Sequence, residues 1–343
     1  MDSITIKDIA KKCGVGVSTV SRAINNHPDI NDETKSKILQ AIKEYNYIPN
    51  NSARNLKRSE SNTIAVLIKG ISNPFFSNML KVFETEIQNQ KYSFILHRVE
   101  EHQNEVDVAL QLVKEKRLKG IVFLGGFFTY SIEKLKQLNV PFVLSTGGVS
   151  GKIDLEYYSS VTVDDFKESY KIVDYLCENG HKKIAILAAP QEDESIGKLR
   201  LSGYLKALED RKIAVNKNLI RRGQDDTIET FSMKYGYEIT KELIESNEDF
   251  TAIYAISDSM AVGACKAVFD MGKKVPDDYS IAGYDGLDIT SYYQPSITTI
   301  RQPVEEMAHE TIRILFDIIN EKLKKEHKTF DGELIIGQST KKL

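Results

Sequence analysis

The 343-residue sequence has no tryptophan, only 3 cysteines and 8 prolines, and no long apolar run. Cys13, Cys177 and Cys265 are far apart, odd in number and without CxxC or metal-ligand spacing. They are typical of small buried residues in a reducing compartment, and they exclude a disulfide scaffold. Since a membrane-spanning helix needs about 20 consecutive apolar residues, the sequence also argues against a membrane partner.

Catalytic and cofactor motifs are missing as well. The sequence has no P-loop, GxGxxG or GxSxG motif. Its 6 histidines, at positions 27, 97, 102, 181, 309 and 327, lack the spacing of a metal site or a catalytic triad. We therefore expect no enzyme activity, no catalytic or metal-binding residues and no cofactor. The start Met1-Asp2-Ser3 leads directly into a helix pattern without a signal peptide, so we expect a cytoplasmic protein.

The charge is low overall but unevenly distributed. The net charge of the chain is −3. Residues 1–60 carry 10 Lys and Arg against 7 Asp and Glu, whereas the remainder carries 36 against 42. A basic head on an acidic body fits one nucleic-acid-binding module and a separate body with another task. A chain of this length is expected to form two or more domains.

The first 45 residues fit three short helices. Thr5 with Asp8 forms a capping-box pattern at the start of the first helix, and Asn31 caps the third. A tight turn at 13–15 separates the first two helices. The residues expected to face inward have helical spacing: Ile6, Ile9, Ala10, Val17, Val20, Ala23, Ile24, Ile38, Leu39 and Ile42. The segment 47–61 is largely polar and is interpreted as a linker.

From Thr63 onward, strand and helix patterns alternate. Apolar strand-like runs occur at 63–68, 92–96, 120–124, 141–145, 183–187, 252–256 and 280–284. Helical patterns lie between them, among them 76–90, 105–116, 166–179 and 259–271. Such alternation with buried strands predicts parallel sheets with helices on both faces. The region is long enough for two such subdomains.

The second helix of the head has an unusual outer face. It carries three small hydroxyl residues, Ser18, Thr19 and Ser21, and a single cation, Arg22. In a helix-turn-helix, this helix enters the major groove, where Thr19 and Ser21 suit phosphate oxygens and Arg22 suits the two acceptors of a guanine. The pattern by itself leaves open an ordinary three-helix bundle with a solvated hydroxyl face.

A longer series of motifs resembles one family. The run TIKDIAKKCGVGVSTVSRAIN at 5–25, followed by YIPNNSARNLK, closely resembles the start of the lactose-repressor/galactose-repressor family of transcription regulators. The resemblance continues, in the family's order, through ISNPFFSNML, VTVDD, ENGHKKIAIL, RLSGYLKAL, AISDSMAVGA, VPDDYSIAGYDG and TTIRQP. It implies an α/β protein in which a small all-α helix-turn-helix head and a hinge helix precede a two-lobed body. That body is similar to periplasmic sugar-binding proteins, with Rossmann-like parallel sheets joined by three crossovers.

The resemblance also implies domain boundaries. The head would cover 1–49, the hinge helix and linker 50–61, and the effector-binding and dimerisation body 62–343. Within the body, the N-lobe would comprise about 62–162 and 292–325, and the C-lobe about 163–291 and 326–343.

The residues that the resemblance assigns to DNA contact lie in the head and the hinge. They are Thr5, Val17, Ser18, Thr19, Ser21, Arg22, Asn25, Tyr47, Asn50, Ala53 and Leu56. Gly16 replaces the family's usual serine cap and removes a phosphate contact, although glycine is an acceptable N-cap. The hinge at 50–57 is too short to be a stable isolated helix, so we expect it to order on DNA beside a second copy. Leu56 would then be a minor-groove wedge; its plainer alternative is packing on the body.

The implied effector site lies between the two lobes. Phe75 and Phe76 would stack on a sugar or base ring, and Arg200 and Asp285 would bind polar groups near strand ends. The full set is Phe75, Phe76, Arg200, Phe231, Ser257, Asp258, Asp285 and Gln302. Plainer alternatives are a core role for the Phe pair, a helix cap at Asp258 and a surface ion pair at Arg200.

The sequence departs from the family's pattern at several positions. Ser257 stands where the family commonly has Asn, Glu168 and Ser169 replace small residues, and Gly337 replaces Arg. The first two departures leave the identity of the ligand open.

Together these features predict a sequence-specific regulator, a repressor that binds a pseudo-palindromic operator as a homodimer, with a tetramer left open. A small effector, a sugar or sugar derivative, would control its DNA affinity as inducer or corepressor. The alternative within this class is a regulator whose corepressor is a phosphorylated carrier protein. A transport-type sugar-binding protein would share the body but lack the basic head.

Overall fold

The computed structural model describes residues 5–24, 27, 29–45, 62–100, 103–128, 132–149, 154–191, 196–223 and 228–343. The chain divides into two compact units, Met1–Ser61 and Asn62–Leu343. The predicted hinge at 50–61 lies outside the described residues.

The head consists of α1 (Ile6–Cys13), α2 (Val17–Ile24) and α3 (Asp32–Glu44). The Thr5 hydroxyl donates to Asp8 Oδ2 over 2.6 Å, and the Thr5 backbone N–H donates to the same oxygen over 2.9 Å. Asn31 Oδ1 caps α3 by accepting from the backbone N–H of Glu33 over 2.8 Å. The helices enclose a small core of Ile9, Ala10, Cys13, Val20, Ala23 and Ile38.

Two of the residues predicted to face inward are exposed. Val17 is 41% exposed and Leu39 is 44% exposed. Leu39 follows the fully buried Ile38, and consecutive residues of a helix point about 100° apart, so both cannot face a core this narrow. Val17 is the first residue of α2, and its side chain is exposed at the start of that helix.

The first sheet of the body is parallel and, within the described ranges, has six strands in the order β13-β7-β5-β3-β1-β2. The strands are β1 (Thr63–Lys69), β2 (Ser93–Val99), β3 (Gly120–Leu124), β5 (Phe142–Ser145), β7 (Ser159–Val163) and β13 (His327–Phe330). Helices α5 (Phe75–Asn89) and α13 (Val304–Ile319) cover one face, and α6 (Glu105–Lys116) and α7 (Ile132–Lys136) cover the other.

Strand β1 shows why this sheet is covered on both faces. Ile64, Val66 and Ile68 pack into the cluster beneath α5 and α13, whereas Ala65 and Leu67 pack into the cluster beneath α6 and α7. Successive side chains of a strand point to opposite faces, so a continuous apolar run requires cover on both sides.

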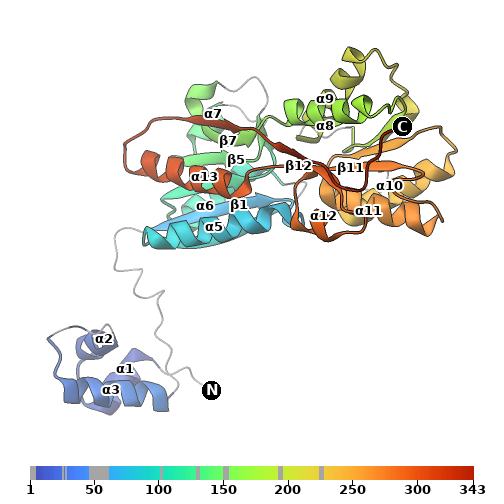
Figure 1. Cartoon of the computed structure of the whole chain (residues 1–343). Helices are drawn as coiled ribbons and strands as arrows, with labels where there is room; N and C mark the ends of the chain where they lie inside the picture. The colour runs from blue at the N-terminus through green and yellow to red at the C-terminus, as the bar shows by residue number, and fades with distance from the viewer. Residues whose placement is uncertain are drawn as a thin grey trace. The chain divides into compact units, whose positions relative to one another are not determined.

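The second sheet, as far as the structure describes it, also has six strands, in the order β14-β12-β11-β10-β8-β9. Only the β12–β14 pair in this sheet is antiparallel among the described strands. In Figure 1, α8 and α9 lie on one side of this sheet and α10 and α11 on the other. The elements are α8 (Asp165–Glu178), β8 (Ile184–Leu187), α9 (Ile196–Asp210), β9 (Ile220–Arg221), α10 (Met233–Glu245), β10 (Ala252–Ala255), α11 (Asp258–Asp270), β11 (Ser280–Asp285), α12 (Asp288–Tyr292), β12 (Thr298–Arg301) and β14 (Glu333–Ile335).

The chain passes between the two sheets in three described places, after β7, β12 and β13. Two lobe assignments predicted from the sequence therefore change. Residues Thr298–Arg301, placed in the N-lobe, pair with β11 in the second sheet, and His327–Phe330, placed in the C-lobe, pair with β7 in the first. These strands are short and rich in polar residues, and their partners are set by long-range pairing that no local pattern reveals.

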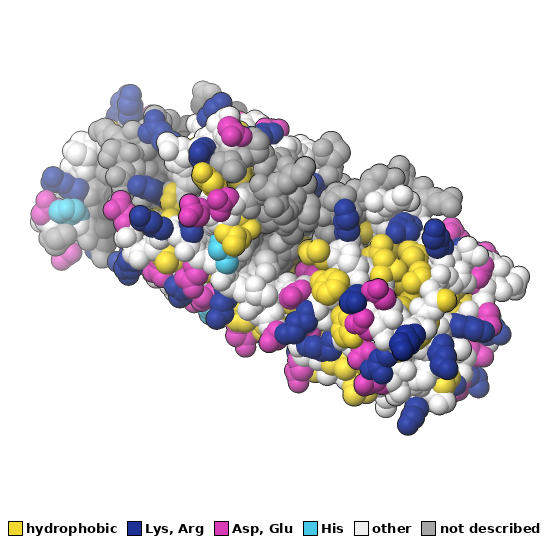
Figure 2. Space-filling model, turned by 90° about the horizontal axis from the view of Figure 1, so that it is seen from above, with side chains coloured by type: hydrophobic (Ala, Val, Ile, Leu, Met, Phe, Trp, Pro, Cys, Tyr) yellow, Lys and Arg dark blue, Asp and Glu magenta, His cyan; other side chains and the backbone are white. Residues whose placement is uncertain are grey.

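This architecture confirms the predicted all-α head and the two parallel-sheet lobes, while the predicted hinge helix lies outside the described residues. Within the described ranges, no helix combines the length and the apolar character that crossing a membrane requires. On the face of the molecule in Figure 2, acidic and basic side chains are interspersed, and hydrophobic side chains gather toward the end that carries the second sheet.

Candidate DNA-reading face and effector site

The outer face of α2 carries the residues predicted to read bases. Gly16 precedes the helix, and its carbonyl accepts from the backbone N–H of Thr19 over 3.0 Å. Val17 and Ser18 are exposed, Thr19 and Ser21 are half-buried, and Val20 lies in the core. The helix therefore presents short side chains outward over a buried apolar edge, as close approach to a phosphate backbone requires.

Arg22 has a partner that sequence reasoning missed. Its side chain is 57% exposed, and Nη1 lies 3.2 Å from Asp29 Oδ2. The other oxygen of Asp29 lies 2.6 Å from His27 Nδ1. An exposed ion pair of this kind contributes about 0–1 kcal/mol, so a guanine can replace Asp29 at small cost. Asp29, an acidic residue seven positions after Arg22 in the sequence, was the available signal.

Several predicted DNA contacts fall outside the described residues: Asn25, Tyr47, Asn50, Ala53 and Leu56. Thr5 is described, and its hydroxyl donates to Asp8 in the capping box at the start of α1. Hydrogen bonds from Thr5 lower the pKa of the Asp8 carboxyl. This contact orders the first turn of the head.

Arg200 is the centre of a buried polar cluster in the second lobe. It lies on α9 and is 2% exposed. Its Nε donates to Asp165 Oδ1 over 2.8 Å, and Nη1 donates to the carbonyl of Ile256 over 2.5 Å. The guanidinium carbon lies 3.7 Å from the centre of the Tyr284 ring. The surface ion pair considered for Arg200 is therefore wrong.

Asp285 faces the same cation. Its Oδ1 lies 3.5 Å from Arg200 Nη1 and accepts from Gln302 Nε2 over 3.0 Å. Burial raises the pKa of Asp285. The positive charge of Arg200 lowers this pKa, and the neighbouring Asp258 raises it further. Burial lowers the pKa of Arg200, but the negative charges of Asp165 and Asp285 outweigh this effect and raise that pKa above its usual range. The structure thus brings together three of the predicted residues, Arg200, Asp285 and Gln302.

Asp258 and Ser257 make internal hydrogen bonds instead. Asp258 Oδ1 accepts from the Thr299 hydroxyl over 2.6 Å, and Oδ2 accepts from the backbone N–H of Leu287 over 2.7 Å. Asp258 is the first residue of α11, and the N-cap is Ser257, whose Oγ accepts from the backbone N–H of Met260 over 3.3 Å. The interpretation of Asp258 as the N-cap is therefore wrong, because the N-cap is the preceding residue, Ser257. The Asp258 side chain therefore holds the loop after β11 against α11, whereas the Ser257 hydroxyl donates to the Phe231 carbonyl over 3.4 Å.

The remaining predicted residues lie around this cluster and in the first lobe. Phe231 packs partly buried against the second core and has φ 64°. Phe75 and Phe76 begin α5 and are 5% and 8% exposed, with ring centres 5.4 Å apart in an edge-to-face arrangement. Both pack in the first core, which agrees with the plainer interpretation of this pair. Their stacking on a ligand stays a prediction.

Sequence reasoning missed the anchoring partners of Arg200. Asp165 is the first residue of α8 and lies two residues after the end of β7. The Ser169 hydroxyl donates to the Arg200 carbonyl over 2.6 Å. Both residues lie in the VTVDDFKES segment, which also departs from the family's pattern at Glu168 and Ser169. Acidic residues at the carboxyl end of a strand were the signal that pointed to this position.

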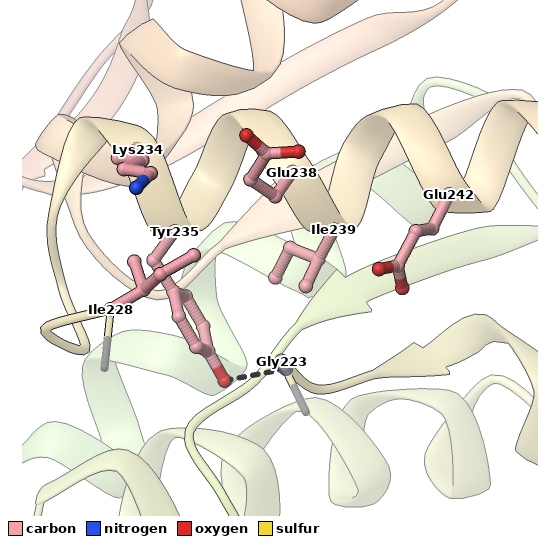
Figure 3. Close-up of a pocket in the computed structure, with 7 residues that line it drawn as sticks. All are labelled: Gly223, Ile228, Lys234, Tyr235, Glu238, Ile239 and Glu242. Atoms are coloured by element: carbon pink, nitrogen blue, oxygen red, sulfur yellow. Dashed lines mark hydrogen bonds between the residues drawn. The ribbon is translucent and has the colours of Figure 1, made fainter. Parts of the chain in front are cut away.

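A separate cavity of about 450 Å³ lies at the edge of the second sheet. It is bounded by α10 and by the segment after β9, and the Tyr235 hydroxyl accepts from the Gly223 backbone N–H over 2.8 Å across it (Figure 3). Its lining is Gly223, Ile228, Lys234, Tyr235, Glu238, Ile239 and Glu242. None of the predicted effector residues is among them, so this cavity is distinct from the Arg200 cluster.

Comparison with known proteins agrees with both units. A family model described as "Bacterial regulatory proteins, lacI family" matches residues 5–50, and one described as "Periplasmic binding protein-like domain" matches residues 173–340. The HTH-type transcriptional regulator MalR of Clostridium butyricum is 43% identical over 334 residues, which are 97% of this chain and 98% of MalR.

Solved structures show the same architecture. The lac repressor dimer bound to operator and the anti-inducer ONPF has a TM-score of 0.74 and 25% identity, over 99% of this chain and 100% of that one. A LacI family regulator from Enterococcus faecium with bound ribose has a TM-score of 0.68 and 28% identity, over 82% of this chain and 99% of that one.

The helix-turn-helix head and the two-sheet body together define a DNA-binding transcription regulator with a body like that of periplasmic binding proteins. The chain belongs to the LacI family of bacterial regulators. MalR and the Enterococcus faecium protein are both named as transcriptional regulators.

Proposed function

We propose that this protein represses transcription as a homodimer on a pseudo-palindromic operator, and that a small carbohydrate effector beside Arg200 and Asp285 controls its operator affinity. One observation carries the effector part. Asp285 is hydrogen-bonded to Gln302, which lies in the crossover between β12 and α13. A ligand that binds Asp285 therefore acts on a residue that is hydrogen-bonded to a segment connecting the two lobes, and through this bond it can bias their relative position.

In this proposal Val17, Ser18 and Arg22 read bases, and Thr19 and Ser21 contact phosphates. The ribose bound by the Enterococcus faecium relative supports a carbohydrate as the effector class. The operator-bound dimer of the lac repressor supports two heads on two half-sites. Coupling of about 1–3 kcal/mol between effector and operator would change DNA affinity about five- to 150-fold.

The test starts from a library of random duplexes from which the full-length protein selects its binding sites. Recovery of a pseudo-palindrome supports the operator part, and recovery of unrelated sequences contradicts it. Operator affinity is then measured with and without a series of sugars. A response to a phosphorylated carrier protein, with none to any sugar, would show that the effector part is wrong.

A further inference from the structure

Basic side chains gather at one end of the first sheet. Its described strands are all parallel, so the connections that lead into them lie at the same, amino-terminal end. The connections into β2, β3 and β13 carry the cations Lys91, Arg117, Lys119, Lys322, Lys324 and Lys325 and the carboxylates Glu321 and Glu326. The described segment before β7 adds Asp154 and Glu156. At the opposite end of this sheet, the described connections hold Glu100, Asp164 and Asp331 and no Lys or Arg.

The connection 320–326 carries three of these lysines across the end of the sheet. It starts at Ile319, the last residue of α13, whose Cδ1 lies 3.1 Å from the position that a Cβ at Gly120 would occupy. Gly120 begins β3. The connection ends at β13, on the edge of the sheet, and on the way Lys325 Nζ lies 5.2 Å from the centre of the Phe142 ring at the start of β5. Its lysines therefore follow the amino ends of several neighbouring strands.

Most of these cations have no counter-charge in the chain. Within the described ranges, none of Lys91, Arg117, Lys322 and Lys324 forms an ion pair. Glu326 is already engaged by Arg313, over 2.7 Å. A helix dipole favours cations within its last turn, but the lysines of the 320–326 connection follow the end of α13 and are not explained by it. The surface is thus left with positive charge for an external partner.

The linker from the head enters the body at this same end. Asn62 leads directly into β1, and the Lys119 backbone N–H donates to the carbonyl of Thr63, the first residue of β1, over 2.8 Å. The head at the other end of the linker matches the LacI family of DNA-binding regulators. DNA held by the head is therefore tethered to the end of the sheet that carries the unpaired cations, and a duplex presents them with a regular row of phosphates.

We propose that this end of the first sheet is a second DNA-binding surface, on which Arg117, Lys322 and Lys324 contact backbone phosphates in addition to those bound by the head. Phosphate contacts carry no direct base information, so this surface adds affinity without sequence preference. It goes beyond the proposed function, because it requires neither an effector nor the base-reading face of α2.

The test measures the affinity of the full-length protein for a fluorescent duplex of about 40 base pairs and scrambled sequence, by anisotropy from about 50 to about 200 mM KCl. Lys322→Gln/Lys324→Gln removes two exposed cations and keeps side chains of similar length. Each lost phosphate contact lowers the slope of log affinity against log salt by about 0.9. We expect binding at about 100 mM KCl to weaken about tenfold and the slope to fall by about 1–2.

Lys273→Gln/Lys274→Gln is the matched control. These exposed lysines lie between α11 and β11, in a helix-to-strand connection of the second sheet, and the change in net charge is the same. Charges beyond about 10 Å are largely screened at these salt concentrations, so the control should bind the duplex within about twofold of the wild type.

The proposal is overturned if the two double variants lose affinity alike, or if Lys322→Gln/Lys324→Gln keeps the affinity and the salt slope of the wild type. Unchanged DNA binding together with lost binding of a phosphorylated carrier protein would also overturn it, and would assign the surface to an acidic protein. Selection of a pseudo-palindrome from random duplexes by the same preparations tests the proposed function separately, because base reading belongs to the head.

Discussion

At the scale of single residues, two arginines in this protein have opposite environments. Arg22 is exposed and weakly paired with Asp29, whereas Arg200 is buried and held by Asp165, Asp285 and a backbone carbonyl. A weakly held guanidinium is available for an external partner, and a fully engaged one fixes the geometry of its neighbours. We therefore expect Arg22 to be available for recognition and Arg200 to fix the positions of Asp165 and Asp285.

Arg22→Ala should remove the preference for operator over scrambled DNA and leave salt-sensitive non-specific binding largely unchanged. One bidentate contact with guanine supplies about 1–3 kcal/mol of discrimination, roughly a five- to 150-fold loss of operator affinity. Gel shifts on the two sequences measure this ratio. Equal losses on both sequences would assign Arg22 to phosphate contact.

Asp29→Asn should have the opposite effect. It removes the exposed ion pair with Arg22 and one negative charge near the reading face, so operator affinity should rise by a few-fold at low salt. Asp32→Asn is the control, because Asp32 lies in the same head at the start of α3 without an observed contact with Arg22. An unchanged affinity for Asp29→Asn would mean that this pair does not restrain Arg22.

At the scale of elements, α8 is tied to a crossover between the lobes. Lys167 Nζ lies 2.6 Å from Asp331 Oδ1, and Lys171 Nζ donates to the Gly332 carbonyl over 2.8 Å. Lys171 also pairs with Glu168, whose side chain is fully buried. Residues 331 and 332 connect β13 of the first sheet to β14 of the second. The first turns of α8 therefore contact both the Arg200 cluster, through Asp165, and the connection between the lobes.

Glu168→Ala should lower the free energy of unfolding by about 1–3 kcal/mol, because it removes a buried partner of Lys171. Glu209→Ala is the control: Glu209 pairs with Lys206 at three-residue spacing but its side chain is 72% exposed, so its loss should cost less than about 0.5 kcal/mol. Urea denaturation of both variants measures the difference. Equal small losses would show that the Glu168 pair does not stabilise the crossover.

At the scale of the whole molecule, the body contains three buried carboxyl groups whose ionisation destabilises the folded state. Burial raises the pKa values of Asp165, Asp258 and Asp285 above the ordinary value of 3.8. A carboxyl with a raised pKa in the folded state contributes stability below its unfolded pKa, and that contribution is lost as pH rises through the folded pKa. The site thus makes the body's stability depend on pH.

As the pH rises from about 4 to about 8, the free energy of unfolding of the wild type should therefore fall relative to that of Asp285→Asn. Asparagine does not titrate, so the variant lacks the contribution of this one carboxyl. Urea denaturation of the full chain at intervals across this range measures the difference, with Asp270→Asn as the non-buried comparison. A difference that stays constant with pH would mean that Asp285 titrates alike in the folded and unfolded chains.

The sequence by itself determined the elements whose signals are local. Glu105–Lys116 is helical as predicted. The apolar runs at 63–68 and 120–124 lie within β1 and β3, and the run at 252–256 extends one residue beyond the end of β10. The capping contacts of Thr5 and Asn31 were also predicted correctly. Side-chain periodicity and helix capping depend on neighbours within a few residues, so the sequence records them directly.

Tertiary structure alone decided the arrangement of the candidate site. Arg200 meets Asp165 and Asp285 from positions far apart in the chain, and β12 and β13 exchange lobes relative to the sequence prediction. Whether a charged side chain is a surface ion pair or a buried anchor depends on the dielectric environment and on the partners that folding brings to it. No spacing along the chain contains that information, because these partners come together only when the strands pair and the helices pack on them.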